Sequence, residues 1–117
     1  MHTNFLPRMN NERIQQLIRF VENEPTEPFN VYALAMEYLD SQPGEARLYL
    51  DQLLANHPDY LPTYYQAAAL YANLDDRDKA AQLYEKGIAL ARAQNNQKTL
   101  QELERAQRAF EDDEDEW

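Results

Sequence analysis

The chain has 117 residues, 44% of them hydrophobic, which is enough for one domain with its own core. It contains no cysteine, which excludes disulfides, thiolate chemistry and cysteine-ligated metal sites. The net charge is −10 and Lys and Arg form no cluster, which argues against nucleic-acid binding. Apolar runs are far shorter than the ~20 residues of a membrane span. No signal peptide opens the chain, so we expect a soluble, cytoplasmic protein.

The N-terminal region falls into two parts. Residues 1–9, MHTNFLPRM, show no hydrophobic periodicity and contain Pro7, so we expect them to be disordered. Over residues 10–24 the pattern predicts a helix, which Pro25 ends. Its apolar residues stand at i, i+3, i+4 and i+7, which places them on one face: Ile14, Leu17, Ile18 and Val21.

Two further helices are predicted over residues 28–40 and 45–56, with Thr26 as the candidate N-cap of the first. The segment SQPG between them indicates a tight turn. The inward residues of the first helix repeat the earlier spacing: Val31, Leu34, Ala35 and Tyr38. Those of the second are Leu50, Leu53 and Leu54.

The remainder of the chain predicts a second helix pair and a last helix. The first of these three helices places four residues on one face: Tyr64, Ala67, Ala68 and Tyr71. A turn at 73–76 leads to a helix that ends near Gln94, with Asp76 or Asp78 suited to its positive N-terminal end. Its inward residues are Ala80, Leu83, Tyr84, Gly87, Ile88 and Ala91. The last helix, over 97–110, buries Leu100, Leu103 and Phe110.

The acidic end of the chain, EDDEDEW, is expected to be a mobile tail over residues 111–117, because adjacent carboxylates repel each other in a helix. Trp117 is read as part of a solvated terminus. As an alternative, an aromatic residue with a free carboxylate after six acidic residues could be a docking tag.

The sequence contains an internal repeat. NEPTEPFNVYALAMEY, from residue 23, is followed 33 positions later by NHPDYLPTYYQAAALYA. Five identities fall at this one offset: Asn23 with Asn56, Pro25 with Pro58, Tyr32 with Tyr65, Ala35 with Ala68, and Tyr38 with Tyr71. A period of this length, with helices on either side of a turn, indicates a helical repeat protein.

The stretch TYYQAAALYANLDDRDKAAQLYEKGIALA resembles a tetratricopeptide repeat, as found in small stand-alone bacterial proteins. The matching positions are the aromatic and small residues Tyr64, Ala68, Tyr71, Ala80, Tyr84 and Gly87. The resemblance implies an all-α solenoid of antiparallel helix pairs with about six helices. It divides the chain into a single domain over 10–110 with repeats over 28–60 and 61–94. Gly87 would cost about 1 kcal/mol relative to Ala in a free helix, so another side chain, such as an aromatic one, is predicted to lie over it.

The resemblance is weaker at two places. The turn of the earlier repeat, SQPGEA, is one residue shorter than NLDDRDKA. In the helix over 97–110, Glu104 and Gln107 replace the small and aromatic residues of a true repeat, so we interpret this helix as an end cap.

The expected function is protein–protein interaction, as a small adaptor or scaffold. In the family that the chain resembles, the first helices of successive repeats line a concave groove that binds a peptide or a single helix. Residues 28–36 and 61–74 contain no charge, so the groove would be uncharged and aromatic. By resemblance it would be lined by Tyr32, Met36, Tyr65, Gln66, Ala69 and Asn73. Chaperone-docking members of the family place Lys, Arg and Asn in the groove to clamp a peptide carboxylate. This chain has Tyr32, Met36 and Gln66 at the corresponding places, so we do not expect it to bind a chaperone tail by that clamp.

Two alternatives remain for the same apolar stripe. It could be core, covered by the first or last helix, or it could be the seam of a homodimer with no foreign ligand. The partner helices carry the charges and offer no comparable surface.

Catalysis and metal binding find little support in the sequence. His2 and His57 are the only histidines, and neither has a second ligand at metal-binding spacing. Ser41 lies in a turn, and the carboxylates are assigned to outer faces and the tail. We therefore expect no catalytic residues, no metal and no cofactor, and a protein or peptide partner in place of nucleic acid or membrane.

Overall fold

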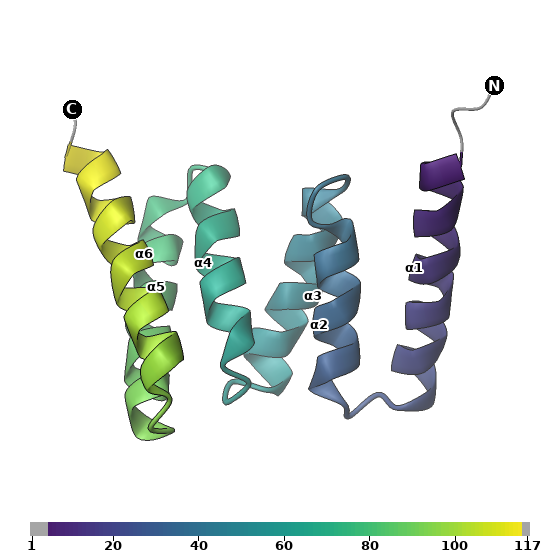
Figure 1. The fold of residues 1–117 in the computed structure, drawn as a ribbon, viewed down its shortest axis with the longest axis horizontal. Helices are drawn as coiled ribbons and strands as arrows, with labels where there is room; N and C mark the ends of the chain where they lie inside the picture. Colours follow the sequence, from purple (N-terminus) through teal and green to yellow (C-terminus); the bar gives the residue numbers. More distant parts are fainter. Residues whose placement is uncertain (1–4, 116–117) are drawn as a thin grey trace. The chain divides into compact units, whose positions relative to one another are not determined.

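The computed structural model describes the backbone of residues 5–115 and the side chains of residues 11–113. Within the described backbone the chain forms six helices and no strand (Figure 1). The helices are α1 (Phe5–Asn23), α2 (Pro28–Tyr38), α3 (Pro43–Asn56), α4 (Pro62–Asn73), α5 (Arg77–Ala93) and α6 (Gln97–Asp115). The predicted all-α class is confirmed.

The helices fall into two compact units, Met1–His57 and Pro58–Trp117. In the first unit α2 packs against both α1 and α3, and in the second unit α5 packs against both α4 and α6. In the second unit α4 also contacts α6, and the two run in the same direction on one side of α5 (Figure 1). Each unit is therefore a helix pair with one additional helix.

The core of the first unit forms where α1 meets the α2–α3 pair. Ile14 and Leu17 of α1 are buried together with Leu34 of α2. Tyr38 and Tyr49 border this cluster with their rings stacked, 5.8 Å between centroids and 2° from parallel. Burial raises the pKa of the Tyr49 phenol, with smaller contributions from Tyr38 and Glu45. The apolar stripe predicted for α1 is thus the surface that packs on the next helix.

In the second unit α4 and α6 approach α5 closely at Gly87. A Cβ built on this residue would lie 2.7 Å from the Cβ of Tyr64 and 3.2 Å from a methyl group of Leu103. Tyr64 itself is buried, and its hydroxyl donates a 2.6 Å hydrogen bond to the carbonyl of Pro58. The prediction that an aromatic side chain lies over Gly87 is confirmed, and α5 needs glycine here because α4 and α6 both press on it.

The two turns of the second unit have the same construction. Asp75 and Asn95 adopt left-handed backbone conformations, with φ of 65° and 57°. The next residue, Asp76 or Asn96, donates its N–H back to the last turn of the preceding helix, at 2.9 Å in both cases. The same two side chains then cap the following helix, by accepting from Lys79 N–H at 3.2 Å and Thr99 N–H at 3.1 Å. This is the Schellman arrangement followed directly by an N-cap.

Two predicted helix starts and one predicted N-cap differ from the structure. α3 begins at Pro43 and not at residue 45, so the last two residues of the expected turn SQPG belong to its first turn. α1 begins at Phe5, before the expected Asn10, which places Pro7 in its first turn. Proline is tolerated there because the N–H that it lacks would have no acceptor within the helix. The N-cap of α2 is Glu27 and not Thr26, since the Glu27 carboxylate accepts from Phe29 N–H at 3.2 Å.

The C-terminal end also differs. The helix predicted to end at Phe110 continues to Asp115, through residues expected to form a mobile tail. Part of the like-charge repulsion is offset because Arg77 of α5 lies 3.7 Å from the Asp113 carboxylate. Residues 1–4, 116 and 117, and with them Trp117, lie outside the described residues.

Candidate functional site

A cleft of 340 Å³ lies in the second unit, between α4 and α6 and above α5. One wall is the uncharged side of α4, and the other is a strip of small and aromatic residues of α6. α5 contributes Tyr84 and Arg77. The full lining is Tyr65, Ala69, Ala72, Asn73, Arg77, Tyr84, Ala106, Ala109, Phe110 and Asp113.

Small residues on both helices create this space. Ala69 and Ala72 of α4 face Ala106 and Ala109 of α6 across the cleft. Larger side chains at these positions would fill the gap between two helices that pack on a common third helix. The cleft therefore follows from alanine at corresponding places on both walls.

Arg77 fixes the far wall. Its guanidinium lies 4.1 Å from the centre of the Phe110 ring, in a cation–π contact. It donates a 2.9 Å hydrogen bond to the carbonyl of Phe110 and pairs with Asp113. The first residue of α5 thus holds the C-terminal part of α6 at three points.

The aromatic groups of the cleft differ in exposure. Tyr84 is 5% exposed, and its ring lies 5.5 Å from that of Phe110. Burial raises the pKa of Tyr84, and the nearby phenol of Tyr65 raises it further. Tyr65 is 40% exposed, so its ring is available to a molecule that enters the cleft.

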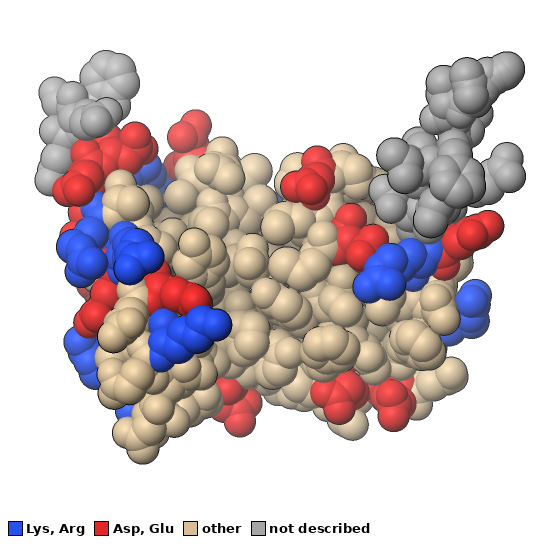
Figure 2. Space-filling view, in the orientation of Figure 1, with Lys and Arg blue, Asp and Glu red and all other residues tan. Residues whose placement is uncertain are grey.

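Charge is distributed unevenly around the cleft. No charged residue occurs in 61–74, and Figure 2 shows an uncharged surface over α4, while charged atoms gather over α6. Among the residues that line the cleft, Arg77 and Asp113 are the charged ones, and they pair with each other. The interior can therefore accept an apolar group without burying an unpaired charge.

The structure places the six predicted site residues in two sets. Tyr65, Ala69 and Asn73 line the α4–α6 cleft, whereas Gln66, also on α4, is half-buried and outside its lining. Tyr32 and Met36 lie on α2 in the first unit, both half-buried.

Sequence reasoning did not assign the residues of the opposite wall to the site. The sequence predicts that α6 is an end cap and that Phe110 is one of its buried residues. The spacing of Ala106, Ala109, Phe110 and Asp113 is the signal that could have located the wall, because i, i+3, i+4 and i+7 define one helical face.

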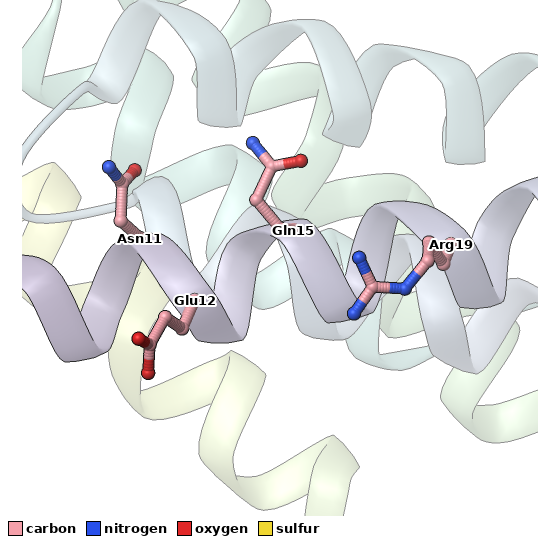
Figure 3. Close-up of a pocket in the computed structure, with 4 residues that line it drawn as sticks. All are labelled: Asn11, Glu12, Gln15 and Arg19. Atoms are coloured by element: carbon pink, nitrogen blue, oxygen red, sulfur yellow. The ribbon is translucent and has the colours of Figure 1, made fainter.

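Two other depressions carry no comparable arrangement. One, of 320 Å³, lies along α1 beside Asn11, Glu12, Gln15 and Arg19. Figure 3 shows that Glu12 points away from Asn11 and Gln15, so these polar groups do not converge on a ligand. The other, of 310 Å³, lies between α5 and α6, where Arg92 and Glu104 form a 3.1 Å ion pair across it.

Two further observations concern the described part of the chain. Its side chains include no group of three or more His, Asp or Glu residues arranged to hold a metal ion. None of the helices in this part is both long and apolar enough to cross a membrane.

Comparison with known proteins identifies the family. No family model matches the chain, and no curated protein sequence does. Among solved structures, the chain is similar to a tetratricopeptide repeat domain protein from Salinibacter ruber, determined by solution NMR. The sequences are 39% identical, the match covers 75% of this chain and 90% of that one, and the TM-score is 0.70.

The chain is also similar to a crystal structure of a tetratricopeptide repeat domain protein from Salinibacter ruber. The sequences are 40% identical, the match covers 73% of this chain and 97% of that one, and the TM-score is again 0.70. The crystal structure of MamA covers 98% of this chain and 76% of that one, with a TM-score of 0.62. Its identity of 18% makes it evidence for the fold alone. The order of the helices, the glycine beneath an aromatic side chain and these similarities agree: the chain belongs to the tetratricopeptide repeat family.

Proposed function

We propose that this protein is a non-enzymatic protein–protein interaction module, a small adaptor or scaffold that binds a peptide segment or a helix of its partner. The observation that carries the proposal is the α4–α6 cleft. Its volume is near the lower end of the ~300–1,000 Å³ usual for ligand pockets. Seven of its ten lining residues are alanine or aromatic, and the other three are Asn73, Arg77 and Asp113.

The dimensions of the cleft fit a short stretch of chain. The lining residues of α4 run from Tyr65 to Asn73, which is about 12 Å along the helix. An extended peptide covers at most about 3.5 Å per residue, so roughly three to four residues would lie along the wall. In this binding mode Tyr65 and Phe110 supply apolar contact, and Asn73 offers an amide to the peptide backbone.

The predicted residues of the first unit belong to the same proposal. Tyr32 and Met36 lie on α2, the counterpart of α4, and residues 28–36 are uncharged. We propose that they form a partner-binding surface on that helix. The alternative function, a homodimer that uses the apolar stripe as its seam, involves the same side chains.

The test is peptide selection on the purified chain. A random peptide display library is enriched on the parent protein, and one selected peptide is then titrated against two variants. Ala69→Arg fills and charges the cleft, whereas Gln82→Arg adds the same charge at an exposed position of α5. We expect Ala69→Arg to abolish binding and Gln82→Arg to preserve it.

Sedimentation velocity on the same proteins addresses the alternative. A parent that sediments as a monomer, with a peptide lost only in Ala69→Arg, supports the adaptor. A parent dimer that Ala69→Arg converts to a monomer, with no peptide enriched, would show that the stripe is a seam between copies.

A further inference from the structure

The charges at one end of the α4–α6 cleft specify the chemistry of its ligand. Because α4 and α6 run in the same direction, both C-terminal ends lie at the same end of the cleft, where Asn73 and Asp113 line it. The carbonyl ends of two helices carry partial negative charge. The N-terminal end of α5, which begins at Arg77 in the same lining, carries partial positive charge, so the side chains decide the sign of this end of the cleft.

The side chains give this end of the cleft an excess of negative charge. Residues 73–79 and 110–113, which form this end, contain six carboxylates and two cationic side chains. Six carboxylates against two cations leave these two segments with a net charge of −4. The negative charge at this end of the cleft is complementary to a cationic group of a ligand.

The two cationic side chains do not reverse this sign. The guanidinium of Arg77 is held against the ring and carbonyl of Phe110, and its side chain is 31% exposed. Lys79 lies with its ammonium 5.9 Å from the centre of the Tyr71 ring. Both cationic side chains thus lie against aromatic rings, and Arg77 is also paired with Asp113.

Asp113 is the carboxylate that reaches the cleft itself. Its side chain is 75% exposed, and Arg77 contacts it at 3.7 Å, which is longer than a hydrogen bond. An ionised carboxylate offers about four acceptor sites in two oxygens, so this contact leaves room for a second cation. The ring of Phe110 lies one turn earlier on the same helix, within the same lining.

We propose that the α4–α6 cleft selects a peptide in which an apolar side chain is followed closely by Lys or Arg. The apolar side chain packs between Tyr65 and Phe110, and the cation lies against Asp113. This inference rests on the proposed function and adds to it the chemical class of the partner: a basic, apolar segment and not an acidic one.

The composition of the selected peptides gives the first test. The display library described above is expected to yield peptides with Lys or Arg within two positions of an aromatic or aliphatic residue. Enrichment of acidic peptides, or of apolar peptides without charge preference, would overturn this inference while the proposed function stands. If no peptide binds, both fail.

The second test is a double-mutant cycle with two synthetic peptides, the selected sequence and its Lys→Gln analogue. Asp113→Asn should weaken the Lys peptide about fivefold, the effect of ~1 kcal/mol, and leave the Gln peptide unchanged. Asp112→Asn makes the same charge change at the preceding exposed residue, outside the cleft lining, and should change the affinity for the Lys peptide less than twofold.

The cycle also separates a direct contact from an indirect effect. If Asp113→Asn acts only by loosening α6 from Arg77, both peptides weaken equally, and the cation contact is refuted. Equal effects of Asp112→Asn and Asp113→Asn on the affinity for the Lys peptide would also refute the placement of the cation against Asp113. A direct contact further predicts that added salt weakens the Lys peptide more than its Gln analogue.

Discussion

The helix pairs α2–α3 and α4–α5 differ at one packing position. In α4–α5 the larger side chain is on the first helix, and in α2–α3 it is on the second helix. In α4–α5 a large residue, Tyr64, lies over Gly87. The corresponding residues of α2–α3 are Val31, 33 positions before Tyr64, and Leu53, which replaces glycine. Val31 and Leu53 are also buried, so both pairs carry core residues at these positions. The comparison teaches that the repeat constrains the combined volume of the two positions more than the residue at either.

The largest expected effect comes from breaking this complementarity. Gly87→Leu should destabilise the protein by about 3 kcal/mol, because even a Cβ would meet Tyr64 at 2.7 Å and force α4 away from α5. Gly44→Leu, at the start of α3, is the matched control, since nothing lies within 4 Å of its added Cβ. Urea unfolding of both variants checks the difference. Equal stabilities would mean that α4 and α5 are farther apart than described.

Introducing the residues of the α2–α3 pair into the α4–α5 pair should restore part of the stability lost in Gly87→Leu. Tyr64→Val combined with Gly87→Leu reproduces the Val31 and Leu53 arrangement. We expect the double variant to be more stable than Gly87→Leu alone by at least ~1 kcal/mol, a coupling typical of residues in contact. Additive effects of the two substitutions in urea unfolding would contradict the volume argument.

The additional helix of each unit is attached by an arginine, but to different extents. Arg77 makes three contacts with α6, whereas Arg13 of α1 has a 2.6 Å ion pair with Glu37 and is 59% exposed. Arg77→Met should therefore cost about 1 kcal/mol, and Arg13→Met less, as usual for exposed pairs.

Amide hydrogen exchange locates these two effects. Arg77→Met is expected to accelerate exchange in the C-terminal half of α6, and Arg13→Met to leave α6 unchanged. An α6 that exchanges at the parental rate without Arg77 would show that the helix holds its position by apolar contacts alone.

The two turns of the second unit offer a stabilising substitution that the first unit lacks, since positive φ values occur only at Asp75 and Asn95 among described non-glycine residues. Asn95→Gly should raise stability by up to about 1 kcal/mol, because glycine adopts this conformation without a steric cost. Thermal unfolding measures the gain. Asn96→Gly should lower stability, because it removes the cap of Thr99 N–H.

The smallest expected effect is on alkaline stability. Burial raises the pKa of Tyr64 and Tyr84 in the second unit and of Tyr49 in the first, above the usual value of 10.0. The folded state then holds these protons more tightly than the unfolded chain does. The stabilisation is complete below pH ~10 and is lost as pH rises through the folded-state pKa values.

Tyr64→Phe sharpens this prediction. The variant loses the hydrogen bond to the Pro58 carbonyl and should be less stable at neutral pH. Its unfolding free energy should nevertheless fall less steeply above pH 10 than that of the parent, because one proton-linked group is gone. Parallel pH profiles in urea unfolding would show that Tyr64 does not contribute to the alkaline transition.

The sequence allowed most of the helical framework to be predicted, because the inward residues follow one period. Leu34, Leu53 and Leu103 were expected to face inward and are fully buried. The start of α1 and the end of α6 were predicted wrongly for a physical reason: hydrogen bonding within a helix continues past the last residue of its hydrophobic pattern. Contacts such as that of Arg77 with Phe110 join residues that no local pattern connects.

The candidate site was less accessible to sequence reasoning. The wall formed by α4 could be predicted because residues 61–74 carry a second uncharged face beside the packing face. The wall formed by α6 could not, since its Ala106 and Ala109 are ordinary helix-forming residues until α4 is placed opposite. A cleft depends on two surfaces, and the repeat pattern describes only one of them.

Within each unit, each helix packs on the next one along the chain, and this has a consequence for how the unit folds. Pairs such as α2–α3 and α4–α5 are close in sequence, so their contacts close short loops and the contact order is low. Helical proteins of this kind fold in microseconds to milliseconds. Because loss of an outer helix leaves the neighbouring pair in contact, opening should begin at α1 and α6 and proceed inward. The wall of the cleft that carries Phe110 and Asp113 would then be among the first parts of the chain to open and the last to close.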